Sequence, residues 1–235
     1  MTRNEPTARR STEIDPTRSE LDNFLADMMA AKKSDVSASG RLIFALDATM
    51  SREETWDMAC SLQGDMFKTV ASIGGLNVQL VYYRGLDECR ASRWVTEPEK
   101  LANLMTKIRC NAGHTQISKI LAHAKRETGL LKVAATVFVG DAFEEEADEI
   151  VPLAQELGQL NTPVFMFQEG KASSVERVFR EIAKASGGAY CRFDSGSADQ
   201  LRELLKLVAT FAVGGVAALE ASKSAEAVKL LSQLK

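Results

Sequence analysis

Three oxygen-bearing side chains lie at alternate positions in one short segment of the chain. They are Asp47, Thr49 and Ser51, and they directly follow an apolar run at residues 42–46. Such a run predicts a buried strand, and the helical pattern that begins at residue 53 predicts a tight, solvent-facing loop between strand and helix. A carboxylate and two hydroxyls in this loop can converge on one point, where they could coordinate a cation.

Two further loops supply oxygen donors. Thr115 follows Gly113 and His114 and stands where it could cap a predicted helix, and Asp141 follows Gly140 after another apolar run. In an open α/β sheet, ligands bind at the carboxyl ends of the strands, so these residues are expected to meet Asp47 there. Because hard divalent cations prefer oxygen ligands and retain some water, the set predicts a Mg²⁺ or Mn²⁺ site.

Alternating apolar runs and helical segments must position these loops. The predicted strands are residues 42–46, 78–83, 90–95, 134–139, 164–167 and 189–193. The predicted helices are residues 53–73, 98–108, 116–127, 144–157, 174–185 and 198–212. This alternation predicts a three-layer, doubly wound α/β fold with a mostly parallel sheet of about six strands and helices on both faces. The polar 90–95 run follows a glycine-containing turn, so it is predicted to be an antiparallel edge strand.

The glutamates at 144–146 are predicted in the first turn of a helix, where the helix dipole favours acidic residues.

The chain divides into three predicted segments. Residues 1–40 form a polar arm with one amphipathic helix at 19–32, and residues 41–213 form the α/β domain. Residues 214–235 begin with a Gly-Gly pair and are predicted to form a helical appendage, with one helix at 217–234. This last helix could pack on its own domain or on a partner.

The composition limits the classes of partner and location. Hydrophobic residues make up 45% of the chain, charged residues make up 26%, and the net charge is -3. This charge creates no strong field for polyanions, so nucleic acid is not an expected partner. Residues 1–20 lack the apolar stretch of a secretory signal, and the weakly polar run at 207–219 is shorter than the roughly 20 residues that span a membrane. We therefore expect a cytoplasmic protein without a membrane span, whose scattered cysteines are reduced.

The oxygen-donor pattern resembles the metal-ion-dependent adhesion site of von Willebrand factor A domains. That family has Asp-x-Ser-x-Ser after the first strand, a distant Thr and a distant Asp. The pattern carries over to Asp47, Thr49, Ser51, Thr115 and Asp141, and the resemblance covers about residues 41–213. It implies a Rossmann-like sheet with the metal site at its carboxyl edge.

The chain departs from the family pattern at two positions. Thr49 replaces the first Ser but keeps a hydroxyl ligand, and His114 stands where the family often has Gly, at the rim of the site. The resemblance implies that one metal position stays open for the carboxylate of an Asp or Glu on a partner protein, without catalysis. Asp47 and Asp141 are the only anions of the set, so the bound metal would keep positive charge to attract that carboxylate. The chain resembles bacterial intracellular members, which often work with ATPase or chaperone-like partners.

Two other functions compete with this interpretation. In a Mg²⁺-dependent phosphatase of the haloacid dehalogenase type, Asp47 would be the nucleophile, and Thr115 and Asp141 would assist. Such enzymes usually carry a second Asp two residues after the nucleophile, where Thr49 cannot act as a general acid or base. In a purely structural module, the same polar residues would cap loops and bind no metal.

Overall fold

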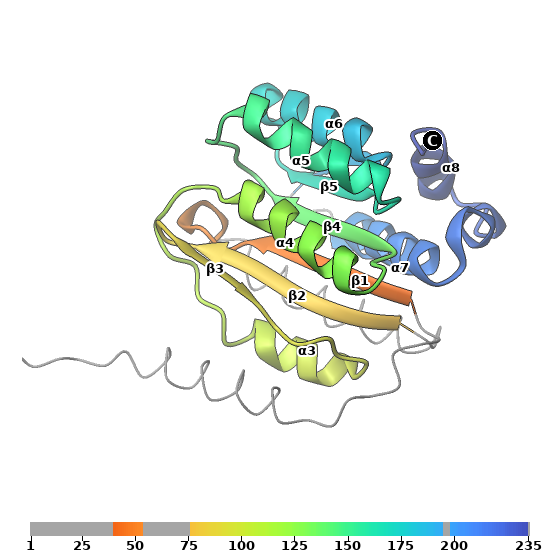
Figure 1. The fold of residues 1–235 in the computed structure, drawn as a ribbon, viewed down its shortest axis with the longest axis horizontal. Coiled ribbons are helices and arrows are strands. Elements are labelled where there is room, and N and C mark those ends of the chain that lie inside the picture. The colour runs from red at the N-terminus through yellow and green to blue at the C-terminus, as the bar shows by residue number, and fades with distance from the viewer. Residues whose placement is uncertain (1–39, 54–75, 195–197, 235) are drawn as a thin grey trace, which may run out of the picture.

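A six-stranded sheet runs through the computed structural model, which describes residues 40–53, 76–194 and 198–234 (Figure 1). The strand order is β3-β2-β1-β4-β5-β6, and every neighbouring pair is parallel except β2 and β3. The strands are β1 (Gly40–Asp47), β2 (Leu76–Arg84), β3 (Glu88–Ala91), β4 (Ala135–Gly140), β5 (Val164–Glu169) and β6 (Tyr190–Phe193). The predicted mostly parallel sheet with one antiparallel edge strand is confirmed.

Helices cover both faces of the sheet, which confirms the predicted three layers. They are η1 (Met50–Arg52), α3 (Pro98–Met105), α4 (Ile117–Leu130), α5 (Ala147–Gln159), α6 (Ser173–Ser186), α7 (Ala198–Ala221) and α8 (Ala225–Leu231). One core cluster joins the sheet to α3, α7 and α8, and a second joins its other face to α4, α5 and α6. Alternate residues of β1 enter the two clusters, so both faces of this strand are covered and its central residues 42–46 are all apolar.

The edge strand β3 differs from its predicted position. It begins two residues earlier than the predicted 90–95 strand and ends at Ala91. Val95 rejoins β2 through an isolated bridge to Val78, while the Ser92 hydroxyl accepts a hydrogen bond from the Leu80 amide at 3.0 Å. The Ser92 side chain thus makes one of the hydrogen bonds to β2 beyond the end of β3, where the regular strand pairing stops.

The C-terminal segment corrects the prediction of one helix at 217–234. α7 continues past the Gly-Gly pair to Ala221, with non-helical geometry at Gly215, and a turn then separates it from α8. Ala227 and Leu230 of α8 are fully buried in the core cluster that contains α7. Of the two alternatives for this segment, packing on its own domain is the one observed.

Within the described residues, one helix is long and apolar enough to cross a membrane by length and composition, at Asp199–Ala221 with a mean hydropathy of 1.7. Its leucines at 201, 204 and 205 are buried against the sheet, and Gly215 interrupts its helical geometry. These contacts are those of a core helix in an α/β domain. The predicted helix at 19–32, and the predicted helix at 53–73 beyond its first residue, lie outside the described residues.

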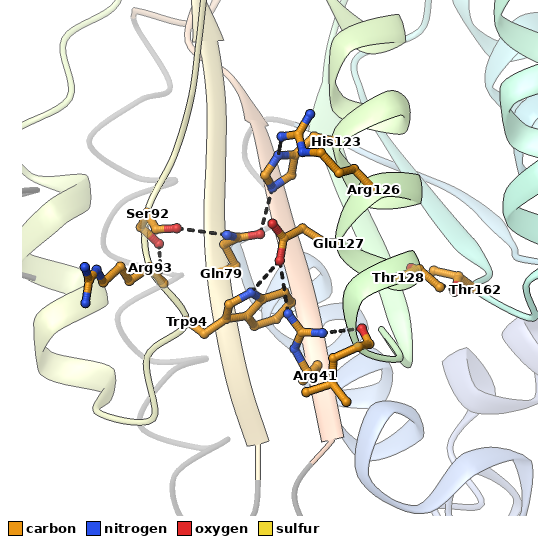
Figure 2. Close-up of polar contacts among 11 residues, drawn as sticks. Arg41, Gln79, Ser92, Arg93, Trp94, His123, Arg126, Glu127, Thr128 and Thr162 are labelled. Atoms are coloured by element: carbon orange, nitrogen blue, oxygen red, sulfur yellow. Dashed lines mark hydrogen bonds and ion pairs between the residues drawn. The ribbon is translucent and has the colours of Figure 1, made fainter. Parts of the chain in front are cut away.

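A polar network fastens α4 to the sheet (Figure 2). Arg41, at the start of β1, pairs with Glu127 of α4 at 3.0 Å, and the Trp94 indole N–H donates to the same carboxylate at 2.8 Å. The Arg41 guanidinium also lies 3.7 Å from the centre of the Trp94 ring. A buried Arg is therefore compensated by both an ion pair and a cation–π contact.

His123 continues this network one turn earlier on α4. Its Nε2 lies 2.8 Å from Gln79 Oε1, and its Nδ1 lies 2.7 Å from the Arg126 guanidinium (Figure 2). Since Arg can only donate, Nδ1 is the acceptor, and the neutral ring carries its proton on Nε2. Burial lowers the pKa of His123, in agreement with a neutral ring.

Candidate metal site

Asp47 is the last residue of β1 and is fully buried, which corrects the expectation of a solvent-facing loop position. Its Oδ1 accepts the Thr49 amide N–H at 2.8 Å, and its Oδ2 accepts the Tyr83 hydroxyl at 2.9 Å. Burial raises the pKa of Asp47, while the bonds from Thr49 and the charge of Arg52 oppose this rise. A nearby cation would further stabilise the ionised carboxylate.

A chain of side-chain contacts joins the other loop residues to Asp141. The Thr49 Oγ1 lies 3.1 Å from the Ser51 Oγ, and the Ser51 hydroxyl donates to Asp141 Oδ1 at 3.0 Å. Because the Ser51 proton is directed to Asp141, the Thr49 hydroxyl is the donor in the first contact. Asp47 joins this chain through its hydrogen bond from the Thr49 amide. The structure thus brings together four of the five predicted ligands, namely Asp47, Thr49, Ser51 and Asp141.

Gly140 allows β4 to approach Asp47 closely. A Cβ atom at Gly140 would lie 2.8 Å from the Phe138 ring and 3.3 Å from the Asp47 Cβ. A larger residue would therefore displace the Phe138 ring and crowd the Asp47 side chain. The Gly in the Gly-Asp pair therefore helps to place Asp141 beside the Asp47 loop.

Thr115 lies in the adjoining loop with different partners. It is buried, its hydroxyl accepts the Glu144 amide N–H at 2.9 Å, and its own amide donates to the Glu144 carboxylate at 3.1 Å. The structure ties Thr115 to Glu144 and does not join its hydroxyl to the contacts that link Thr49, Ser51 and Asp141. A place for Thr115 among the metal ligands remains a prediction.

The predicted role of Thr115 as a helix cap is wrong. α4 begins at Ile117 after Gln116, and the carboxylate of Glu145 accepts the amide N–H groups of Ile117 and Ser118. The prediction for the glutamates at 144–146 is also wrong, because α5 begins only at Ala147. Glu145 does act on a helix N-terminus, as the dipole favours, but on that of α4.

The Thr115 loop is attached to its neighbours on two sides. The His114 amide donates to the Gly85 carbonyl at 3.2 Å, and the Asn111 amide donates to the Ala48 carbonyl at 3.1 Å. A Cβ atom at Gly113 would lie 1.9 Å from the Gly85 oxygen, so only Gly fits there. The His114 side chain is 70% exposed, with Nδ1 3.4 Å from Glu144, so it is largely solvated.

Sequence reasoning missed a buried ion pair beneath the Asp47 loop. Arg52 is 1% exposed, and its Nε and a terminal nitrogen lie 3.0 and 2.8 Å from the Glu169 Oε2. Another terminal nitrogen donates to the carbonyls of Asp47 and Val139 at 3.3 Å each. The detectable signal was a Glu at the carboxyl end of a strand, at the sheet edge where the ligands were expected.

The donors that come together suit a hard cation. They are carboxylate and hydroxyl oxygens, which Mg²⁺ and Mn²⁺ prefer. Both Asp47 oxygens already accept one hydrogen bond, but each has a second lone pair for a metal or a metal-bound water. The described residues contain no cluster of three or more His, Cys, Asp or Glu side chains that could hold a metal, so a cation here would depend on the hydroxyls of Thr49 and Ser51.

Comparison with known proteins shows similarity in structure but not in sequence. No family model matches the chain, and no curated protein matches it. A von Willebrand factor type A structure from Catenulispora acidiphila has a TM-score of 0.58 at 15% identity and covers 74% of this chain. The match spans only 43% of that protein, so this chain corresponds to less than half of its length.

Two further structures are similar. The VWA domain of SpRpn10 has a TM-score of 0.57 at 10% identity, and the match covers 72% of this chain and 95% of that domain. The manganese-loaded TRAP protein of Plasmodium vivax has a TM-score of 0.55 at 14% identity, and the match covers 72% and 74% of the two chains. Identities this low establish the architecture alone. The chain therefore has the von Willebrand factor A fold.

Proposed function

We propose that this protein is a metal-dependent recognition module, which binds Mg²⁺ or Mn²⁺ through Asp47, Thr49, Ser51, Thr115 and Asp141. Through the metal it would bind an Asp or Glu side chain of a partner protein. The observation that carries the proposal is the set of hydrogen bonds that joins Asp47, through the Thr49 backbone amide and the Thr49 and Ser51 hydroxyls, to Asp141 at the carboxyl edge of the sheet. The manganese in the TRAP protein of the same fold supports a cation in such a module.

The surroundings of Asp47 support recognition without catalysis. Each of its carboxylate oxygens is held by a protein donor, and the side chain is fully buried. A nucleophile must be reached by the substrate itself, whereas a ligand need only be reached by a small cation, so a fully buried carboxylate favours metal binding over attack on phosphate. Neither the fold nor the site supports the phosphatase alternative.

The partner and the location belong to the proposal as well. We infer a bacterial, cytoplasmic module that works with an ATPase or chaperone-like protein. Its three described cysteines are free thiols, which is in keeping with a reducing compartment. The acidic side chain on the partner is the feature that the open metal position would recognise.

Isothermal titration of Mn²⁺ and Mg²⁺ into the metal-free protein tests the site. We expect saturable binding at one site, weakened at least about tenfold in Asp47→Asn, Ser51→Ala and Asp141→Asn, because each variant removes a ligand or its charge. Asp47→Asn is preferable to Asp47→Ala, which would leave the buried Thr49 amide and Tyr83 hydroxyl without their acceptor.

Asp148→Asn is the matched control, because it removes the same charge from an exposed position in α5. Its cation affinity should equal that of the unmodified protein. If neither cation binds the unmodified protein, the polar residues of the site only cap loops, as in the structural-module alternative. Metal-dependent hydrolysis of p-nitrophenyl phosphate that is lost in Asp47→Asn would favour the phosphatase instead.

A further inference from the structure

The strand β6 has an outer edge that no neighbouring strand occupies in the described sheet. β6 stands last in the strand order and pairs only with β5. The carbonyls of Ala189 and Phe193 accept β5-side amides at 2.9 and 3.1 Å. Since backbone groups alternate in direction along a strand, those of Tyr190 and Arg192 face the outer edge.

Two glutamine side chains bond to this edge. Gln233, just after α8, accepts the Tyr190 amide N–H at 3.0 Å, and Gln200 of α7 donates to the Arg192 carbonyl at 3.4 Å. A side-chain amide offers the same donor and acceptor as the peptide group of an adjacent strand. The second bond is long, so an incoming backbone could replace it at little cost.

A hollow of about 330 Å³ lies along the same edge and carries an excess of cations. Arg180, Arg192 and Lys229 line it together with Glu176 and Asp194. The Glu176 carboxylate forms ion pairs with both arginines, at 2.8 Å from Arg180 and 3.6 Å from Arg192. Asp194 instead lies 3.7 Å from Lys171, a cation outside the lining.

The two arginines remain available to a ligand. Their side chains are 55% and 46% exposed, and Arg180 is held over the Tyr190 ring, 4.2 Å from its centre. The protein as a whole has a net charge of -3, so this local excess of cations opposes the overall charge. The edge therefore combines strand-pairing groups with a preference for anions.

We propose that the outer edge of β6 binds an extended, acidic segment of a partner protein as an added strand. The backbone of that segment replaces the contacts of Gln200 and Gln233, and alternate acidic side chains pair with Arg180 and Arg192. Lys229 of α8 attracts a further acidic side chain. β6 lies three positions from β1 in the strand order, whereas the predicted metal ligands lie at the ends of β1 and β4. A segment bound at the outer edge of β6 therefore would not contact the metal.

The probe is a fluorescein-labelled nine-residue peptide of alternating Glu and Thr, and the measurement is fluorescence anisotropy at low salt with EDTA present. We expect saturable binding that is lost when Lys replaces Glu. A peptide with the same side chains but N-methyl groups at alternate amides should also fail to bind, because it cannot donate the ladder hydrogen bonds.

Variants of the protein identify the surface. Arg192→Glu and Lys229→Glu should each weaken binding at least about threefold, because they reverse a charge beside the peptide. Lys184→Glu makes the same change at an exposed position of α6 outside the hollow, so its affinity should be unchanged.

Three results would overturn the proposal. Equal binding of the N-methylated peptide would mean general electrostatic attraction, and unchanged affinity in Arg192→Glu would place the peptide elsewhere. Sedimentation of the unmodified protein as a dimer, with Arg192→Glu as a monomer, would assign the edge to a second copy of the chain. Because EDTA is present throughout, failure of the metal site would not affect any of these results.

Discussion

Arg52 places a positive charge directly beneath the loop that carries Asp47, Thr49 and Ser51. Because it is almost fully buried, it must be paired, and Glu169 on β5 provides its counter-charge. Its bonds to two backbone carbonyls join the ends of β1 and β4. The oxygen donors are thus positioned by a residue that is not itself one of the predicted metal ligands.

Removal of one partner of this buried pair should be costly. Arg52→Ala is expected to lower the free energy of unfolding by about 3–5 kcal/mol, because Glu169 would remain buried without a counter-charge. The double variant Arg52→Met with Glu169→Leu should lose much less, which urea unfolding can measure. Arg180→Ala breaks a more exposed pair with Glu176 and should cost less than about 1 kcal/mol. Equal losses of unfolding free energy in Arg52→Ala and Arg180→Ala would contradict the expectation that breaking the buried ion pair costs more than breaking the exposed one.

Individual residues show how much of the candidate site could be predicted from the sequence. The proximity of Asp47, Thr49, Ser51 and Asp141 could be predicted because each follows an apolar strand, and strand ends meet at one edge of the sheet. The pairing of Arg52 with Glu169 spans 117 positions and depends on how β5 lies beside β4. No local pattern encodes that separation, so the pair became visible only in three dimensions.

At the scale of elements, α4 is held at both ends by carboxylates. Glu145 accepts amides at its N-terminus, and Glu127, near its C-terminus, binds Arg41 and Trp94. The first contact comes from the segment between β4 and α5, which explains why α5 begins later than its acidic sequence predicted. The strands were predicted more closely, because covered faces require apolar residues whatever the tertiary contacts.

The neutral His123 between these ends predicts a dependence of stability on pH. Burial lowers its pKa, so the unfolded chain gains a proton near the ordinary value of about 6.5 while the folded protein resists it. Protonation would also set a cation against Arg126, although Glu127 partly offsets this effect. Stability from this group is therefore complete above about pH 6.5 and is lost as the pH falls.

Chemical unfolding at several pH values between 7 and 5 measures this effect. The unmodified protein should lose more stability over this range than His123→Gln, which has no proton to gain at this position. Identical pH profiles for the two proteins would show that His123 does not contribute.

At the scale of the whole molecule, the C-terminal segment completes one layer of the fold. Leu230 of α8 is fully buried beside α7, whereas Val228 of the same helix is 61% exposed. The sequence predicted a helix here but could not tell which surface it covers, because an apolar helix face can pack on its own domain or on a partner. The turn after Ala221 directs α8 back onto the sheet domain.

A matched pair of variants tests this packing. Leu230→Ala should lower the free energy of unfolding by about 2–5 kcal/mol, because it leaves a cavity in the core. Val228→Ala should change it by less than about 0.5 kcal/mol, because its side chain faces solvent. A small loss in Leu230→Ala, seen in urea unfolding, would mean that α8 is not part of the cooperative core.

The contact between Gly113 and Gly85 has a mechanical consequence. The two backbones touch with no side chain between them, so there is no compressible layer to absorb a displacement. A tensile load on the β2–β3 hairpin would pass directly to the loop that holds Thr115. A partner that pulls on this end of the sheet would therefore strain the proposed cation-binding edge itself and not merely the surface to which it is attached.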